Sequence, residues 1–394
     1  MQYTEQAGLP EPDDLSARHS REVAAHITER IRQAGGSIGF AEYMQAALYA
    51  RGLGYYAAGA TKFGTDGDFV TAPEISSVFG RVLARQVAEV LQQLEAGSVL
   101  EFGAGSGKLA VDLLLALEQL DAMPEHYLIL EVSADLQQRQ QQRLQRDVPQ
   151  HVERVRWLSD LPAAHSGVVI ANEVLDALPV ERFTRSADAV LQQRVESTAE
   201  GFRFTSGDAP AQLAATVSSI EEALGAPLAE GYTSEVSMGA APWVADIAAM
   251  LEQGVVFLFD YGCSRSEYYA ADRSDGWLRC HFRHRAHDNP LILPGIQDIT
   301  AWVDFTGIAE SAVAAGLAVA GYQPQAMFLA GGGLQQELQG MTDLPPEQQL
   351  ALSAQIKTLT LPGEMGEKFK CMALSRGLAE APSAFLLGDR IHTL

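Results

Sequence analysis

Short apolar runs alternate with segments of helical periodicity from residue 98 onward, and this alternation restricts the possible folds more than any other feature of the chain. The apolar runs read SVLEF, YLILEV, VRWL, GVVIAN and, later, VVFLFDYG, and the first two intervals between them, 106–120 and 133–146, have helical periodicity. Short buried strands separated by helices indicate βαβ units, so we predict an α/β fold with a mostly parallel sheet covered on both faces. Ligands of such sheets bind at the carboxyl ends of the strands.

The remaining segments are predicted to surround this core. Helical periodicity indicates helices over 20–34 and 40–50 and a third helix capped by Ser77. Residues 55–76 are rich in glycine and turn formers, which predicts a long irregular loop. The domains that we predict are a flexible tail at 1–19, a helical N-terminal region with a lid loop at 20–97, and a core at 98–394 with an α/β insert at 181–250 and a further C-terminal region at 263–305.

Charge and cysteine content limit the classes of partner. The chain has 394 residues, of which 28 are basic and 50 acidic, giving a formal net charge of -22. Such a surface repels phosphate backbones and anionic lipids, so we expect neither a nucleic acid nor a membrane partner. The start lacks the pattern of a secretory or transit peptide, and we expect a cytoplasmic protein. Cys263, Cys280 and Cys371 have no zinc-ribbon spacing and are predicted to be reduced and packed in or near the core.

The glycine loop EFGAGSGKLA, residues 101–110, fits one ligand pattern better than two others. A Walker loop would need glycine in place of Phe102 and a hydroxyl residue in place of Leu109. A dinucleotide loop would need a third glycine where Lys108 stands. An acid followed by GxGxG fits completely, through Glu101, Gly103, Gly105 and Gly107. A carboxylate there suits a cationic ligand such as S-adenosylmethionine, and the helix that we expect to start at Ser106 offers N–H groups to its carboxylate.

Three further polar residues follow predicted strands and are candidates for the same ligand. Glu131 ends YLILEV, where an acid can bind two ribose hydroxyls of either a nicotinamide or a methionine nucleoside. Asp160 follows VRWL and is a candidate for the adenine amino group, with an ordinary loop acid as the alternative. Asn172 ends GVVIAN and is predicted to face the methionine and methyl region.

Several motifs, in order along residues 40–375, make the chain similar to the MidA family, which includes the mitochondrial protein arginine methyltransferase that acts on a subunit of respiratory complex I. These motifs are DFVTAPEISSVFG, EFGAGSGKLA, ANEVLDALPV, FDYG, LRCHFRHR with DITAWVDF, and MGEKFK. The resemblance implies a Rossmann-like class I methyltransferase core with a seven-stranded sheet, a family-specific extra region, and a role in complex I assembly. It implies protein arginine methylation with a respiratory NADH dehydrogenase subunit as the partner.

Glu173 and Asp176 in NEVLDALP are our candidate catalytic residues. Carboxylates can bind the N–H fork of a guanidinium, localise its charge and leave one nitrogen aimed at the methyl group. If the segment continues as a helical turn, the spacing of three places both acids on one face. Glu235 in the insert is a weaker third candidate. We expect Asp260 and Tyr261 to line the acceptor pocket, although Asp260 could instead cap a turn.

Two other motifs lead to structural predictions. Asp68, Thr71, Pro73 and Glu74 belong to the long loop, which we expect to fold over the cofactor as a lid, with Thr71 and Pro73 in contact with it. The histidines of HFRHRAH recur every three residues, which suits a helix better than a strand, yet the neighbouring arginines oppose a divalent cation. We therefore expect no metal and prefer a structural or acceptor-side loop.

Other functions remain open at this level. A small-molecule methyltransferase, a non-catalytic assembly factor that binds the cofactor and, more distantly, a nicotinamide dehydrogenase use the same groups. The sequence fixes neither the acceptor, the number of methyl groups nor the oligomeric state, although a homodimer is possible.

Overall fold

The computed structural model describes residues 8–58, 71–94 and 96–394, and the chain divides into two compact units. Unit 1 consists of 1–69, 176–240 and 264–302, and unit 2 of 70–175, 241–263 and 303–394. Within the described residues, no helix is long and apolar enough to span a bilayer. Each unit has its own sheets and apolar core and is described separately.

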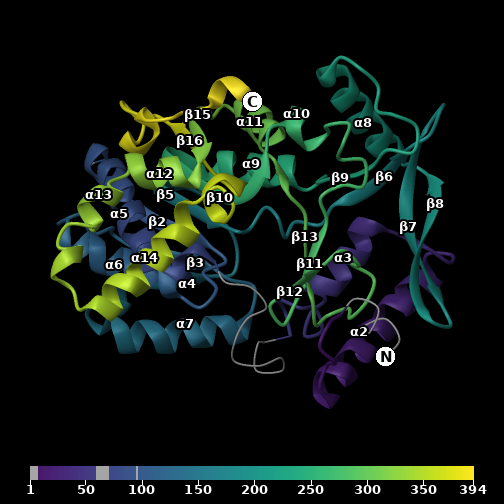
Figure 1. Ribbon diagram of the computed structural model, residues 1–394, viewed down its shortest axis with the longest axis horizontal. Helices are drawn as coiled ribbons and strands as arrows, with labels where there is room; N and C mark the ends of the chain where they lie inside the picture. Colours follow the sequence, from purple (N-terminus) through teal and green to yellow (C-terminus); the bar gives the residue numbers. More distant parts are fainter. Residues whose placement is uncertain (1–7, 59–70, 95) are drawn as a thin grey trace. The chain divides into compact units, whose positions relative to one another are not determined.

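Unit 2 contains an eight-stranded sheet in which seven strands follow the order β15-β16-β10-β5-β2-β3-β4, with β14 paired to β10 (Figure 1). Strands β2 to β5 and β10 pair in parallel, whereas β16 is antiparallel to both of its neighbours. The sheet is therefore mostly parallel, as its apolar runs predict. Its strands are β2 (Ser98–Phe102), β3 (Tyr127–Leu130), β4 (Val155–Leu158), β5 (His165–Asn172), β10 (Leu251–Cys263), β14 (Val303–Asp304), β15 (Ala318–Pro324) and β16 (Phe369–Arg376).

The helices of unit 2 precede, connect and follow the strands of this sheet along the chain. Those before β10 are α4 (Ala72–Ile75), α5 (Ser77–Gln93), α6 (Lys108–Gln119), α7 (Ala134–Asp147), the 3-10 helix η2 (Pro149–Arg154) and α9 (Ala240–Met250). Those after it are α11 (Phe305–Ala314), α12 (Gln325–Gly331), α13 (Leu334–Glu337), η3 (Met341–Asp343), α14 (Pro346–Thr360), α15 (Met365–Lys368), η4 (Ser383–Leu386) and η5 (Ile391–Thr393). The cap of α5 is Ser76, whose hydroxyl accepts from the Val78 amide at 3.3 Å, and not Ser77.

Both faces of the unit 2 sheet are buried, which explains why its strands are continuously apolar. Val168 and Ile170 of β5 belong to the core that includes α5 and α6. Val169 and Ala171 alternate with them, point to the opposite face and are equally inaccessible. Because the residues of both faces are buried, every position in the middle of this strand is apolar.

Unit 1 combines helices with two small antiparallel sheets. One sheet has the order β1-β7-β6-β9 with β8 added to β7, and the other has the order β12-β11-β13. The strands are β1 (Ile38–Gly39), β6 (Glu181–Arg185), β7 (Val190–Thr198), β8 (Gly201–Asp208), β9 (Thr233–Val236), β11 (Arg279–Phe282), β12 (Arg285–His287) and β13 (Asp298–Thr300). The helices are α2 (Asp14–Gln33), α3 (Phe40–Tyr49), α8 (Ala211–Leu224) and α10 (Arg265–Tyr268).

The predicted flexible tail at 1–19 is wrong in its C-terminal part, because α2 already begins at Asp14. The Asp13 carboxylate accepts from the amides of Leu15 and Ser16, at 3.1 and 2.9 Å, and so caps the helix. The first turn of α2 is polar, so apolar periodicity does not indicate where the helix begins. The contact boundaries, at 69/70 and 175/176, also differ from those predicted at 97/98 and 180/181.

Candidate functional site

The order of the unit 2 sheet reverses at β2, and such a switch point is where open α/β sheets bind ligands. From β2 the chain proceeds to β3 and β4 on one side and then to β5 on the other. Phe102 at the end of β2 pairs with Leu130 of β3 and Ala171 of β5. The residues that follow these positions, Gly103, Glu131 and Asn172, therefore lie at one edge.

The glycine loop has the left-handed backbone that its sequence predicts. Gly103, Gly105 and Gly107 have φ values of 59°, 51° and 80°. Gly107 is the N-cap of α6, so the helix begins at Lys108 and not at Ser106 as predicted. A Cβ on Gly103 would lie 3.8 Å from Val174 Cγ2, which places the loop beside the ANEV segment after β5.

Glu101 is a buried acid directly beneath this loop. Its side chain is 3% exposed, and the Tyr127 hydroxyl donates to its Oε2 at 2.6 Å. Burial raises the pKa of Glu101 to about 7, the Tyr127 hydrogen bond opposes the rise, and repulsion from Glu131 adds to it. A positively charged or hydrogen-bond-donating ligand would favour the ionised form.

Glu131 is the second buried acid at the edge, and burial raises its pKa as well. Its Oε1 accepts from the Ser133 amide at 3.0 Å, and its Oε2 accepts from Gln140 Nε2 at 3.1 Å. These contacts fix the carboxylate. The next side chain, Val132, is 75% exposed and leaves an apolar surface beside the acid.

Gln140 of α7 connects the glycine loop to Glu131. Both lie at the edge of the sheet where β2, β3 and β5 end, which we call the cofactor edge. Sequence reasoning missed this residue. Its Nε2 donates to the Gly105 carbonyl at 3.0 Å as well as to Glu131, and its Oε1 accepts from Trp157 Nε1 at 2.8 Å. The side chain is completely buried. Its position in the glutamine-rich stretch QQRQQQ gives no local sign of this role.

Asp160 and Asn172 differ in how firmly they are held. Asp160 is exposed after β4, and the Ser159 hydroxyl donates to it at 2.8 Å. Asn172 Nδ2 donates to Glu173 Oε1 at 3.4 Å. Its buried Oδ1 accepts no hydrogen bond from the described residues, so this acceptor is available for a ligand.

Glu173 lies on a turn and not on a helix, which corrects the predicted arrangement of the acids. Its φ is 53°, a strained value for a side-chain-bearing residue, and its amide donates to the Phe259 carbonyl at 2.8 Å. Asp260 Oδ2 accepts from the amides of Val174 and Leu175, at 3.2 and 2.9 Å. Asp260 therefore caps this turn, the structural alternative considered for it.

Asp176 does not share a helix face with Glu173. The contact boundary falls between them, so that Glu173 belongs to unit 2 and Asp176 begins a segment of unit 1. Asp176 is 4% exposed, and its carbonyl accepts from the Ala301 amide at 3.0 Å. Its surroundings in unit 1 include the partly buried tyrosine Tyr56, whose pKa its charge helps to raise.

The segment with Thr71, Pro73 and Glu74 forms the short helix α4, whose N-cap is Thr71. Pro73 is buried and Glu74 contacts Ser106 of the glycine loop, so this part of the predicted lid does lie at the loop. Asp68 lies outside the described residues.

Other candidates from the sequence have structural roles in unit 1. Glu235 is fully buried, where Arg182 Nε at 3.1 Å and the Trp277 amide at 2.7 Å bind it, and burial raises its pKa to about 6. HFRHRAH, where we predicted a structural or acceptor-side loop, forms a β-hairpin with Arg283 and His284 in left-handed conformations, so its histidines do not lie on a helix. No group of metal ligands occurs among the described residues, and all three cysteines are buried.

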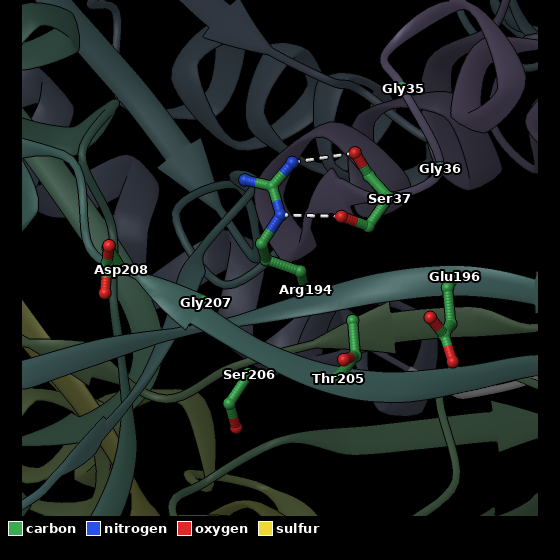
Figure 2. Close-up of a pocket in the computed structure, with 9 residues that line it drawn as sticks. All are labelled: Gly35, Gly36, Ser37, Arg194, Glu196, Thr205, Ser206, Gly207 and Asp208. Atoms are coloured by element: carbon green, nitrogen blue, oxygen red, sulfur yellow. Dashed lines mark hydrogen bonds between the residues drawn. The ribbon is translucent and has the colours of Figure 1, made fainter.

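A groove of about 450 Å³ in unit 1 contains none of the predicted site residues (Figure 2). Its guanidinium, Arg194, is held by the hydroxyl and the carbonyl of Ser37 at 2.9 and 2.7 Å. The groove is therefore not the cofactor edge, which lies in unit 2.

The unit 2 edge fits an adenosyl ligand with a cationic end. It offers two buried carboxylates, a loop without side chains at its glycines, an exposed apolar face at Val132 and an open acceptor on Asn172. A pyrophosphate at the glycine loop would meet Glu101 unfavourably, whereas Glu131 suits the ribose of either kind of nucleoside. The fold and the edge thus define an α/β enzyme that binds a nucleoside cofactor.

Comparison with known proteins identifies the family. A family model described as "Putative S-adenosyl-L-methionine-dependent methyltransferase" matches residues 82–323. The Drosophila melanogaster "Protein arginine methyltransferase NDUFAF7 homolog, mitochondrial" is 28% identical over 412 residues, which cover 94% of this chain and 89% of that protein. Its Homo sapiens counterpart is 27% identical, with 89% and 82% covered.

A crystal structure from Burkholderia thailandensis, bound to S-adenosyl-homocysteine, matches with a TM-score of 0.91 and 41% identity over 98% of this chain and 100% of that one. The chain therefore belongs to this family of S-adenosylmethionine-dependent methyltransferases, and it is a MidA-type enzyme related to NDUFAF7. Its cofactor is S-adenosylmethionine.

Proposed function

We propose that this methyltransferase methylates arginine in a protein partner, with a respiratory NADH dehydrogenase subunit as the acceptor. The similarity to proteins named protein arginine methyltransferase, which extends over about nine-tenths of the chain, is the observation that carries this proposal. The strand order of unit 2, with β16 as the reversed strand, supports a class I methyltransferase core. The net charge of -22 favours a basic segment as partner.

We propose a role for each polar group at the cofactor edge. Glu101 and the loop of Gly103, Gly105 and Gly107 would hold the methionine end, and Glu131 would bind the ribose hydroxyls. Asp160 would receive the adenine amino group, and Asn172 would face the methyl region. Thr71 and Pro73 would contact the cofactor from the α4 side.

The chain's own part in the chemistry is alignment and charge placement. S-adenosylmethionine supplies an electrophilic methyl group on its sulfonium when bound. Glu173 would accept N–H groups of the acceptor guanidinium and localise its positive charge, so that another nitrogen is aimed at the methyl group. The turn fixed by Asp260 holds Glu173 in its strained conformation.

Transfer of labelled methyl groups to a lysate of a strain lacking the gene tests this proposal. Glu173→Gln should lower transfer by roughly 100-fold or more, because it removes a charge-stabilising group, while cofactor binding is retained. Glu252→Gln, a change at an exposed acid, is the matched control. Mass spectrometry should locate the wild-type label on arginine of one protein.

Two outcomes would contradict the proposal. Label that appears only in a small molecule would favour the small-molecule methyltransferase. Cofactor binding without any label, together with a partner complex that Glu173→Gln leaves intact, would favour an assembly factor.

The cytoplasmic location and a homodimer stay predictions; the named relatives are mitochondrial.

A further inference from the structure

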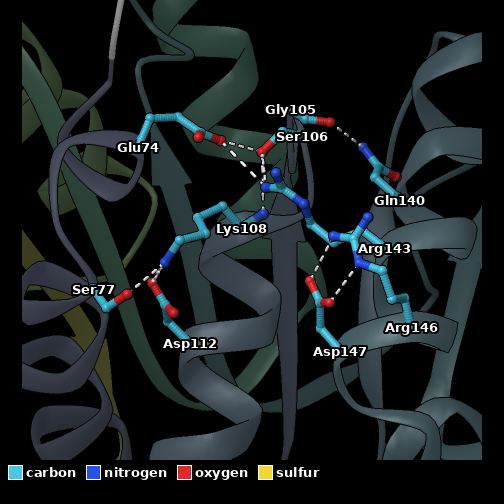
Figure 3. A network of polar contacts seen from close by, with 10 residues as sticks. All are labelled: Glu74, Ser77, Gly105, Ser106, Lys108, Asp112, Gln140, Arg143, Arg146 and Asp147. Atoms are coloured by element: carbon cyan, nitrogen blue, oxygen red, sulfur yellow. Dashed lines mark hydrogen bonds and ion pairs between the residues drawn. The ribbon is translucent and has the colours of Figure 1, made fainter.

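Three side chains from separate elements of unit 2 meet on the glycine loop, and we call Glu74, Ser106 and Arg143 the Glu74 clasp (Figure 3). The Ser106 hydroxyl donates to Glu74 Oε1 and accepts from Arg143 Nη1 at 2.6 Å. Arg143 Nη1 also lies 3.6 Å from Glu74 Oε1, so the carboxylate and the guanidinium form an ion pair across the hydroxyl. Glu74 comes from α4 and Arg143 from α7.

All of the hydrogen-bonding capacity of the Ser106 hydroxyl is occupied in this arrangement. A hydroxyl can donate one hydrogen bond and accept two. Ser106 donates to Glu74, and it accepts from Arg143 and, at 3.3 Å, from the Lys108 amide. Loss of either partner therefore removes a fixed orientation of the loop.

A second attachment joins the same segments. Lys108 Nζ donates to the Ser77 hydroxyl at 2.6 Å and pairs with Asp112 of its own helix. The first residue of α6 is thus tied to the first residue of α5. Residues 74–77 are attached at one end to Ser106 of the glycine loop, through Glu74, and at the other to Lys108, through Ser77 (Figure 3).

Ser106 matters because its neighbours in the loop offer no side chains. Gly105 and Gly107 both have positive φ, and glycine loses more backbone freedom on ordering than any other residue. Helix α7 holds the Gly105 carbonyl through Gln140 and the Ser106 hydroxyl through Arg143. Among the hydrogen bonds of the described residues, Glu74 is the one partner of the Ser106 hydroxyl that belongs neither to α7 nor to the segment 103–108.

We propose that the Glu74 clasp is a positioning device that orders the glycine loop for S-adenosylmethionine and sets the rate at which the cofactor leaves. Glu74 and Arg143 act on the cofactor through Ser106 and the loop backbone. Because their side chains are 37% and 27% exposed, the ion pair is weakened by salt. The clasp makes cofactor residence sensitive to ionic strength.

Stopped-flow dissociation of S-adenosyl-homocysteine from the purified full-length chain tests the proposal. Glu74→Ala and Arg143→Ala should each accelerate dissociation by roughly 3- to 10-fold, and the double variant should be little faster than either single one. High salt should accelerate the wild type and leave Glu74→Ala unchanged. Arg146→Ala is the matched control, because Arg146 is on the same helix but pairs with Asp147.

Two further readouts separate positioning from general stability. Hydrogen exchange of the loop amides in the cofactor-free protein should rise in Glu74→Ala and not in Arg146→Ala. The KM for S-adenosylmethionine should rise while kcat does not fall. Glu74→Gln, which keeps an acceptor for Ser106 but loses the charge, should be intermediate and replaces Glu74→Ala if the latter does not fold.

The proposal is overturned if Glu74→Ala or Glu74→Gln folds normally and releases S-adenosyl-homocysteine at the wild-type rate. Equal acceleration by Arg146→Ala would also overturn it, because the effect would then be a general response to charge loss on α7. Neither result depends on the identity of the methyl acceptor.

Discussion

Glu101→Gln is expected to stabilise the cofactor-free protein at neutral and alkaline pH. The carboxyl group of Glu101 is 3% exposed, and its pKa is about 7 instead of 4.5, chiefly because burial disfavours the charged form. Glutamine has nearly the same shape and stays neutral. Its carbonyl oxygen can still accept the 2.6 Å hydrogen bond from the Tyr127 hydroxyl.

The magnitude follows from the difference between the folded and unfolded pKa values. Below pH 4.5 Glu101 is protonated in both states, and its ionisation contributes nothing to the free energy of unfolding. Between pH 4.5 and 7 the unfolded chain loses the proton while the folded chain keeps it, so stability falls as pH rises. Above pH 7 the deficit is constant at about 3 kcal/mol, and Glu101→Gln removes it.

Urea unfolding of the cofactor-free wild type and variant between pH 5 and 8.5 measures this difference. The stability gain of Glu101→Gln should grow by roughly 2 kcal/mol or more over this range, most of it before pH 7. Glu125→Gln, at an exposed acid before β3, controls for the loss of one negative charge. A gain that is the same at pH 5 and pH 8.5 would refute the reasoning.

Two other variants test the residues that position the site. Gln140→Ala should weaken S-adenosylmethionine binding by roughly 10-fold or more in calorimetry, because it leaves Glu131 and the loop carbonyl without their amide donor; equal binding by this variant and the exposed control Gln141→Ala would contradict this. Asp260→Asn should cost about 1 to 3 kcal/mol of stability and lower kcat through displacement of Glu173, with cofactor affinity retained; an unchanged kcat and an unchanged unfolding midpoint would show that the cap is dispensable.

The sheet and the cofactor loop could be predicted because each depends on local pattern. Apolar runs define the strands whatever their partners, and the left-handed glycines of 103–107 are required by the backbone itself. The acid at the end of β2 follows directly from its place in the run. For HFRHRAH the spacing of three residues suits a helix, whereas the structure forms a hairpin with a left-handed two-residue turn, so the spacing alone did not indicate the local structure.

Residues that act through tertiary contacts could not be predicted in this way. Gln140 resembles its glutamine neighbours, and only the fold shows that it joins Gly105 to Glu131. Glu173 was found by its position after β5, but the turn that holds it depends on Asp260, 87 residues later. A helical prediction for NEVLDALP could not include a cap from so distant a strand.

The cofactor edge combines groups that are unfavourable together until a ligand arrives. Glu101 and Glu131 are both buried, both have raised pKa values, and the charge of Glu131 raises that of Glu101 further. A cationic ligand that donates hydrogen bonds relieves both penalties, so cofactor affinity should increase with pH toward neutrality, and this increase should be smaller in Glu101→Gln, which keeps only Glu131. Part of the free energy that the buried Glu101 charge costs the free protein is therefore recovered when the cofactor binds.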